Sequence, residues 1–250
     1  MYREISKGEQ GKQISGFSQY RRDRKPKTPT VIRQNLLAYY DFGNSKSYTG
    51  SGVTVNDISG QGSNISLTNT PTYSPVYNGV EKFNSTNTRG SVTVPNVSRT
   101  AMTYISFIKR NGNTGDYGGI NLHRTSTASG NVIGLIFRGT TNQISYLWGS
   151  SPSNYDFVSN LTPPLGQWCM VAAAIDLTGG TLYLNNESIN NATTNVAVSP
   201  GTVLLMGNDA SWIVGRGCNC DIGVSLIYTR KLTTSEIMQT FEVFRTRYGI

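Results

Sequence analysis

The stretch Val53–Asn64 reads Val-Thr-Val-Asn-Asp-Ile-Ser-Gly-Gln-Gly-Ser-Asn, a short alternating strand that runs into a polar loop. Gly60 and Gly62 can adopt the positive φ angles that a side chain penalises. Asp57 and Ser59 can accept hydrogen bonds from the backbone amides just ahead of them. The stretch therefore predicts a tight turn at the end of a strand.

The composition around this stretch points the same way. The chain has 250 residues, of which 14 are Tyr and 27 are Gly, and 37% are hydrophobic. Tyr suits twisted strands, Gly suits the turns between them, and this apolar fraction is enough to bury a core. The composition predicts an all-β fold.

Turn signals separate short apolar or alternating segments along the chain. The predicted strands lie near residues 35–42, 90–95, 102–110, 131–138, 142–148, 167–176, 180–185, 202–206 and 220–230. Gly179-Gly180 predicts a hairpin between two of them.

A single helix is predicted at the C-terminal end. Thr233-Thr234-Ser235-Glu236 fits a capping box, in which Thr233 and Glu236 each bond the other's backbone amide. Apolar residues then recur on one helical face, at Ile237, Phe241, Phe244 and Tyr248. We expect this face to pack against the sheets and to have a structural role.

Residues 1–34 form a predicted basic, extended arm, and residues 35–250 a single jelly-roll domain. Residues 1–33 carry nine basic and three acidic groups, and so contribute +6 of the net charge of +8. They lack the apolar residues needed to order themselves. The basic residues proposed to dock on a partner are Arg3, Lys7, Lys12, Arg21, Arg22, Arg24, Lys25 and Lys27.

A protein partner is favoured over nucleic acid for this arm, because the remaining 217 residues add a net charge of only +2. No signal peptide is visible, and no apolar run approaches the roughly 18 residues that span a bilayer. We therefore expect no membrane insertion.

The cysteines are Cys169, Cys218 and Cys220. Cys218 and Cys220 stand too close in sequence for an easy disulfide between strands. We expect free, buried thiols, as in a protein made in a reducing compartment. Cys-x-Cys in a chain with one His is weak evidence for zinc, because a closed site needs four ligands.

Several short motifs, taken in order, resemble the concanavalin A-like lectin/glucanase superfamily, and in particular the laminin-G-like jelly-roll domains of phage and large-virus structural proteins. The matching segments are residues 36–41, 57–64, 167–172, 181–185 and 227–232, followed by the predicted helix and residues 247–250. The resemblance implies two antiparallel sheets packed face to face, one convex and one concave. It does not imply one function.

Enzymatic members of this superfamily carry paired carboxylates at Glu-x-Asp-x-x-Glu spacing on one strand, and no such run occurs here. A Ser-His-Asp or Cys-His site would need His123, the single histidine, and the chain has no Gly-x-Ser-x-Gly elbow. His123 is predicted at the surface or at a strand end. We expect no catalytic residues.

Sugar binding needs an aromatic platform and nearby polar groups. The candidate carbohydrate-binding residues are Trp148, Tyr155, Asn208, Asp209 and Trp212. The alternative is that Trp148 and Tyr146, which share the phase of Ile144 on an alternating strand, belong to the core.

No cofactor is expected. Calcium is the one weak alternative, with Asp57, Asn64 and Asp209 as candidate ligands. The Asp57 loop is interpreted chiefly as a turn.

From the sequence we expect the chain to be a non-enzymatic structural protein of a virion. Its arm would anchor it to other virion proteins, and its jelly-roll body would lie at the surface and bind host glycans weakly. The alternative is a carbohydrate-binding adhesin of a phage tail fibre. A glycan hydrolase or lyase ranks third.

Overall fold

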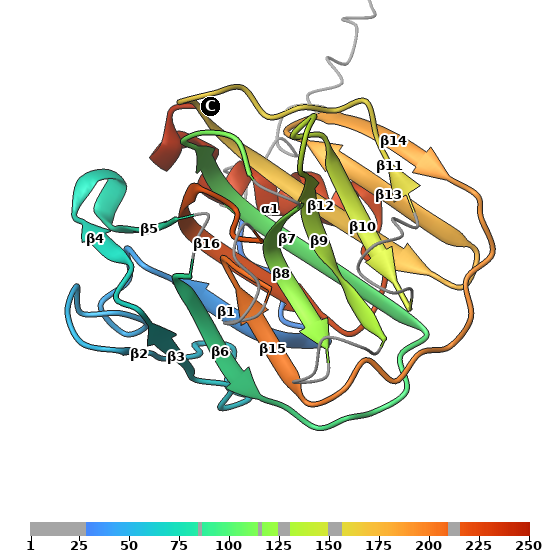
Figure 1. The fold of residues 1–250 in the computed structure, drawn as a ribbon, viewed down its shortest axis with the longest axis horizontal. Helices are drawn as coiled ribbons and strands as arrows, with labels where there is room; N and C mark the ends of the chain where they lie inside the picture. The colour runs from blue at the N-terminus through green and yellow to red at the C-terminus, as the bar shows by residue number, and fades with distance from the viewer. Residues whose placement is uncertain (1–28, 85–86, 115–116, 125–130, 150–156, 210–215) are drawn as a thin grey trace, which may run out of the picture.

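Two antiparallel sheets of eight strands each pack face to face in the computed structural model of the chain. The structure describes residues 29–250 except 85–86, 115–116, 125–130, 150–156 and 210–215. In Figure 1 one sheet faces the viewer, and the helix lies behind the other. The predicted jelly-roll sandwich with a C-terminal helix is confirmed.

The first sheet lies beneath the helix. Its strands run in the order β14-β13-β12-β7-β16-β5-β4, and β1 pairs with β16 beside this path. The bounds are β1 Leu36–Asp41, β4 Thr72–Ser74, β5 Val80–Phe83, β7 Ala101–Arg110, β12 Trp168–Asp176, β13 Gly179–Leu184, β14 Glu187–Asn191 and β16 Cys220–Tyr228.

The second sheet faces the viewer in Figure 1 and runs in the order β11-β10-β9-β8-β15-β6-β3-β2. Its bounds are β2 Thr54–Val55, β3 Ile65–Thr68, β6 Arg89–Thr93, β8 Tyr117–Arg124, β9 Val132–Arg138, β10 Ile144–Trp148, β11 Phe157–Val158 and β15 Val203–Met206. All nine strands predicted from the sequence are present in one sheet or the other, with ends shifted by a few residues.

The main core lies between the sheets and follows from the alternation of side chains along each strand. Phe83 from the first sheet and Phe137 from the second are both fully buried in it. Tyr146 and Trp148 also belong to this core, so the alternative interpretation of these two rings is confirmed.

The helix α1, Thr234–Tyr248, covers part of the outer face of the first sheet. Its predicted capping box is confirmed, because Thr233 accepts from the Glu236 amide and Glu236 accepts from the Thr233 amide at 2.9 Å. The four apolar residues predicted to face the sheet are all buried. In the part of the chain that the structure describes, no helix has the length and apolar character to cross a membrane.

The Asp57 loop is the predicted turn. Gly60 and Gly62 have φ angles of 96° and 78°. The Asp57 carboxylate accepts from the amides of Tyr39 (2.9 Å), Ser59 (2.8 Å) and Ser63 (3.1 Å). The loop thereby ties β1 to the start of the second sheet.

The prediction of free thiols is wrong for Cys218 and Cys220, which form a disulfide. Asn219 between them has a left-handed φ of 44°, and this bend brings the two Cα atoms to 5.3 Å, within the usual range for a disulfide. Cys169 is free and buried, as expected.

Candidate functional site

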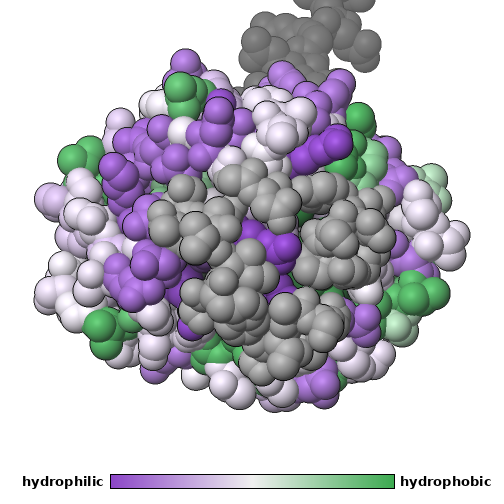
Figure 2. Space-filling view, in the orientation of Figure 1, coloured by the Kyte–Doolittle hydropathy of each residue, from purple (hydrophilic) through white to green (hydrophobic). Residues whose placement is uncertain are grey.

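The outer face of the second sheet carries an apolar patch separate from the core between the sheets. Its buried members are Tyr117, Leu122, Val132, Ile136, Leu147 and Leu205. Figure 2 views the molecule from this side and shows strongly hydrophilic residues at its centre, between the parts whose placement is uncertain. The hydrophilic residues of this face therefore lie over a buried apolar layer.

The segment after β15 lies across this face. Asn208 forms a bridge with Gly217, and the Gly119 amide of β8 donates to the Arg216 carbonyl at 3.0 Å. A Cβ at Gly119 would come within 3.2 Å of the Asp209 nitrogen, so a residue without a side chain allows this close approach. Gly119 thus lets the chain place Asp209 and Arg216 directly above β8.

A charged cluster is built where this segment crosses β8. The buried Asp209 carboxylate accepts hydrogen bonds from the Arg124 guanidinium and the Tyr117 hydroxyl, and from Arg216 at 3.1 Å. The Arg216 guanidinium also lies 4.7 Å from the centre of the Tyr117 ring. Burial, and then the Asp209 charge, raise the pKa of Tyr117 above its usual range, so its hydroxyl remains a proton donor.

The cluster has one partly exposed member. The side chains of Arg124 and Asp209 are 1% and 0% exposed, whereas that of Arg216 is 15% exposed. A buried ion pair contributes little net stability unless its remaining hydrogen bonds are satisfied, and Asp209 has three donors. Asp209 thereby holds the planar Arg216 guanidinium against the Tyr117 ring, over the buried apolar layer.

The structure places the sequence-predicted sugar-binding residues differently. Trp148 is 3% exposed and donates its indole NH to the Val196 carbonyl at 2.7 Å, so its ring faces are inside the core. Asn208 and Asp209 do come together beside the cluster, but both are fully buried. Tyr155 and Trp212 lie outside the described residues.

The residues that sequence reasoning missed are Tyr117, Arg124 and Arg216. Tyr117 and Arg124 lie on β8, a strand that was not predicted because it begins Tyr-Gly-Gly and ends Asn-Leu-His-Arg. Arg216 lies nearly 100 residues further along the chain. The one local signal was the alternation along β8, which places the side chains of Leu122 and Arg124 on a common face.

His123 lies one residue from the end of β8, as the strand-end alternative predicted, but it is fully buried between the sheets, so the surface alternative is wrong. It follows Leu122 on β8 and therefore points inward, opposite Ile133 and Leu204. Burial, followed by the charge of Arg99, lowers the pKa of its imidazole to about 4. The ring is thus neutral at physiological pH and enclosed by protein.

The candidate calcium ligands already have partners in the protein. The Asp57 carboxylate holds its own loop, Asn64 Oδ1 accepts from the Asp57 amide at 2.8 Å, and Asp209 binds its arginines. Within the ranges that the structure describes, there is no group of three or more His, Cys, Asp or Glu side chains that could hold a metal ion.

One buried carboxylate lies far from this face. Glu81 of β5 is fully buried, and neither of its carboxylate oxygens has a hydrogen-bond partner among the described residues. Burial raises its pKa to about 7, although the nearby Tyr48 hydroxyl opposes part of this rise. The Tyr48 proton itself goes to the Gly52 carbonyl at 2.9 Å.

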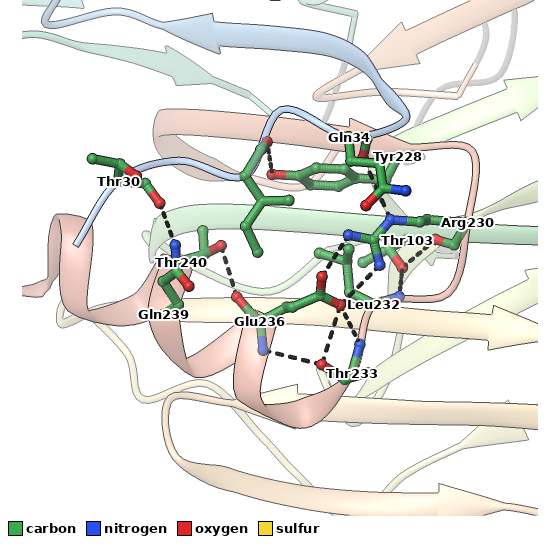
Figure 3. Close-up of polar contacts among 11 residues, drawn as sticks. Thr30, Gln34, Thr103, Tyr228, Arg230, Leu232, Thr233, Glu236, Gln239 and Thr240 are labelled. Atoms are coloured by element: carbon green, nitrogen blue, oxygen red, sulfur yellow. Dashed lines mark hydrogen bonds and ion pairs between the residues drawn. The ribbon is translucent and has the colours of Figure 1, made fainter.

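The end of the predicted arm is held on the opposite side of the molecule. Figure 3 shows side chains of β16, the loop after it and α1 pointing at the backbone of residues 30–34. The Thr30 carbonyl accepts from Gln239 at 2.7 Å. The Ile32 carbonyl accepts from Tyr228 at 3.2 Å, and the Gln34 carbonyl accepts from Arg230 at 3.4 Å. Residues 1–28 lie outside the described residues.

This grip is coupled to the helix cap. Arg230 forms two hydrogen bonds with Glu236, at 2.8 and 2.6 Å, and Glu236 is also the second residue of the capping box (Figure 3). The pKa of Glu236 is lowered to about 2. The hydrogen bond from Arg230 is the largest cause, and the bonds from Thr233 lower it further. The point where the arm leaves the body is therefore fixed beside the start of α1.

Two facing antiparallel sheets, with a helix across the outer face of one of them, define a jelly-roll type of β-sandwich. The family model for the concanavalin A-like lectin/glucanases superfamily matches residues 83–238, and the chain belongs to this superfamily. Its fold occurs in both enzymes and binding modules. No curated protein matches the chain.

Solved structures with a similar fold include sugar-binding proteins. A Trypanosoma rangeli sialidase in complex with sialic acid is 14% identical with a TM-score of 0.63, over 88% of this chain and 34% of that one. Domain 4 of the arabinanase AbnA from Geobacillus stearothermophilus, in complex with arabinotriose, is 19% identical with a TM-score of 0.64, over 82% and 97%.

The ligand-binding domain of botulinum neurotoxin serotype D, in complex with N-acetylneuraminic acid, is 14% identical with a TM-score of 0.62, over 84% and 51%. The chain spans about a third of the length of the sialidases that it resembles. At these identities the likeness establishes the fold alone.

Proposed function

We propose that the chain is a non-enzymatic carbohydrate-binding module whose ligand face is the outer face of the second sheet. The observation that carries the proposal is the Arg216 guanidinium held on the Tyr117 ring by the buried Asp209. A guanidinium offers fixed donors to sugar hydroxyls or carboxylates, and Arg216 is the member of the cluster whose side chain is partly exposed. Structural neighbours crystallised with sialic acid and arabinotriose support the same class of ligand.

The distribution of acids supports binding rather than hydrolysis. None of the eight strands of the second sheet, as far as the structure describes them, contains Asp or Glu. Asp209, which lies over this sheet, is already engaged by two arginines and a tyrosine. Most glycoside hydrolases use two carboxyl groups that flank one bond, and the described part of this face offers a single one, which Arg124 and Arg216 already hold.

A virion role remains a second proposal and rests on the arm. Residues 1–28 carry eight basic and three acidic groups, so they suit an acidic partner surface. The described end of the arm is held on the helix side, opposite the proposed ligand face. An anchored module would therefore present its sugar-binding face away from its partner, which suits an adhesin as well as a virion surface protein.

A glycan array with the full chain tests the binding proposal. We expect glycans on the array to bind, with an affinity that falls at least about tenfold in Arg216→Gln. The affinity should fall less in Arg216→Lys, which keeps the positive charge but loses the planar arrangement of N–H donors. Arg245→Gln is the matched control, since Arg245 lies exposed on α1 and pairs with Glu242. Equal binding by Arg216→Gln and the control would contradict the proposal.

The arm is tested separately by deleting residues 1–28, which leaves the residues gripped by α1 in place. We expect the truncated chain to bind the same glycans as the full chain but not to be incorporated into virus particles. Normal incorporation of the truncated chain into particles would count against the anchoring proposal.

A further inference from the structure

A second surface, on the outer face of the first sheet, brings together a row of functional side chains. Strand register places Trp168 beside Lys109, Lys109 beside Asp221, and Asp221 beside Lys82. The row thus crosses β12, β7, β16 and β5 near the C-terminal end of α1. The glycan face proposed above lies on the other sheet, so the two surfaces are independent.

Tyr77 is a partly exposed aromatic residue at the end of this row. Its side chain packs edge-on against Trp168, with ring centres 5.4 Å apart, and the residue is 40% exposed. It lies in the short 3-10 helix η1, Val76–Asn78, with a left-handed φ of 57°. A left-handed conformation is costly for a residue with a side chain, and such strain is often found at ligand-binding sites.

Arg247 of α1 holds Tyr77 in this conformation. Its guanidinium donates to the Tyr77 carbonyl at 2.6 Å and to the Gly79 carbonyl at 3.2 Å. A third bond, at 2.6 Å, joins it to the Asp41 carboxylate. The backbone of Tyr77 is therefore fixed before any ligand arrives, which lowers the entropy lost on binding.

The two aromatic rings packed against Tyr77 each carry a polar atom that has no hydrogen-bond partner in the described part of the chain. The Trp168 indole NH and the Tyr248 hydroxyl are both buried, and neither has a hydrogen-bond partner among the described residues. Their residues are 5% and 3% exposed, and their ring centres lie 4.5 Å apart. Buried polar groups are nearly always hydrogen-bonded, so two groups without a partner set this part of the first sheet apart.

The charged part of the row determines the ligand class. Lys109 pairs with Asp221 at 2.8 Å, and Asn111 donates to the other Asp221 oxygen at 2.6 Å. Lys109 is 28% exposed and Asp221 10%. An anionic ligand would face the Asp221 carboxylate, whereas sugar hydroxyls can both accept from the ammonium and donate to the carboxylate.

We propose that Tyr77, Lys109, Asp221 and Trp168 form a second binding site, for an uncharged pyranose ring of a glycan. The ring stacks its CH face on Tyr77 and directs its hydroxyls to Lys109 and Asp221. This site does not require the second-sheet site to bind anything.

The test is calorimetry of the full chain with neutral oligosaccharides selected on an array, comparing wild type, Tyr77→Ala, Tyr77→Phe and Asp221→Asn. We expect Tyr77→Ala to weaken binding at least about tenfold and Tyr77→Phe, which keeps the ring, to bind within about threefold. Asp221→Asn keeps the shape of the side chain and should weaken binding without loss of the fold, as checked by circular dichroism. Arg245→Gln, an exposed substitution on α1 outside both sites, is the control and should leave binding unchanged. Arg216→Gln is measured alongside it to tell the two faces apart.

Unchanged affinity in both Tyr77→Ala and Asp221→Asn would overturn the proposal, as would the absence of any neutral glycan that binds the wild type. Loss of binding in Arg216→Gln alone would support the second-sheet site and refute this one. Binding lost in the Tyr77 and Asp221 variants alone would support this site and count against the other.

Discussion

Glu81 predicts an unusual dependence of stability on pH. Glu81 is fully buried, lies opposite Tyr73 in the β4–β5 pair and near the Tyr48 hydroxyl, and burial raises its pKa from 4.5 to about 7. Between these two values the unfolded chain has lost the proton and the folded chain keeps it. Stability therefore falls as pH rises from about 4.5 to about 7, and the full loss remains above that range.

The substitution Glu81→Gln removes this titration while keeping the size of the side chain. The interval between 4.5 and about 7 corresponds to about 3 kcal/mol, at about 1.4 kcal/mol for each tenfold change. We expect the free energy of unfolding of Glu81→Gln, relative to wild type, to rise by about this amount between pH 4.5 and pH 8. Comparing the two proteins cancels every titration that they share, including that of His123.

Urea unfolding followed by circular dichroism at several pH values measures this difference. Glu242→Gln is the matched control, because it makes the same chemical change at a carboxylate that is half exposed on α1. We expect the control to follow wild type. A difference between Glu81→Gln and wild type that stays constant from pH 4.5 to pH 8 would refute the reasoning.

Three further predictions concern the fold. Burial lowers the pKa of His123 from 6.5 to about 4, so the folded protein loses stability as pH drops through this interval. At pH 4, His123→Leu should therefore retain up to about 3 kcal/mol more of its free energy of unfolding than wild type. Urea midpoints that change equally with pH in the two proteins would contradict this. Thr233→Ala removes the helix cap and should lower the free energy of unfolding by about 1 kcal/mol. An unchanged midpoint of thermal unfolding would contradict this prediction. Alkylation of the denatured, unreduced chain should modify Cys169 alone, whereas labelling of Cys218 and Cys220 as well would show that their disulfide is absent.

The architecture could be predicted because it depends on local signals. Strand alternation, the turn glycines and the Thr233–Glu236 capping box each act over a few residues, and each appears in the structure as expected. The core positions of Tyr146 and Trp148 likewise follow from the period of two along β10.

The candidate site could not be predicted because its parts are distant in sequence. Asp209 meets Tyr117 and Arg124 across 92 and 85 residues. The strand carrying both partners starts with glycines that argue against a strand, yet Gly119 is needed for the close approach of Asp209. The Cys218–Cys220 disulfide depends on the left-handed Asn219, which the sequence pattern does not specify.

The central claim is that the outer face of the second sheet binds carbohydrate. The most direct measurement is an amide chemical-shift titration of the full chain, in a Tyr77→Ala background, with a glycan that it binds on an array. The account predicts the largest shifts at Tyr117, Asp209 and Arg216, saturating together with one dissociation constant. Saturable shifts confined to the first sheet or to the loops of the Asp57 turn would contradict it.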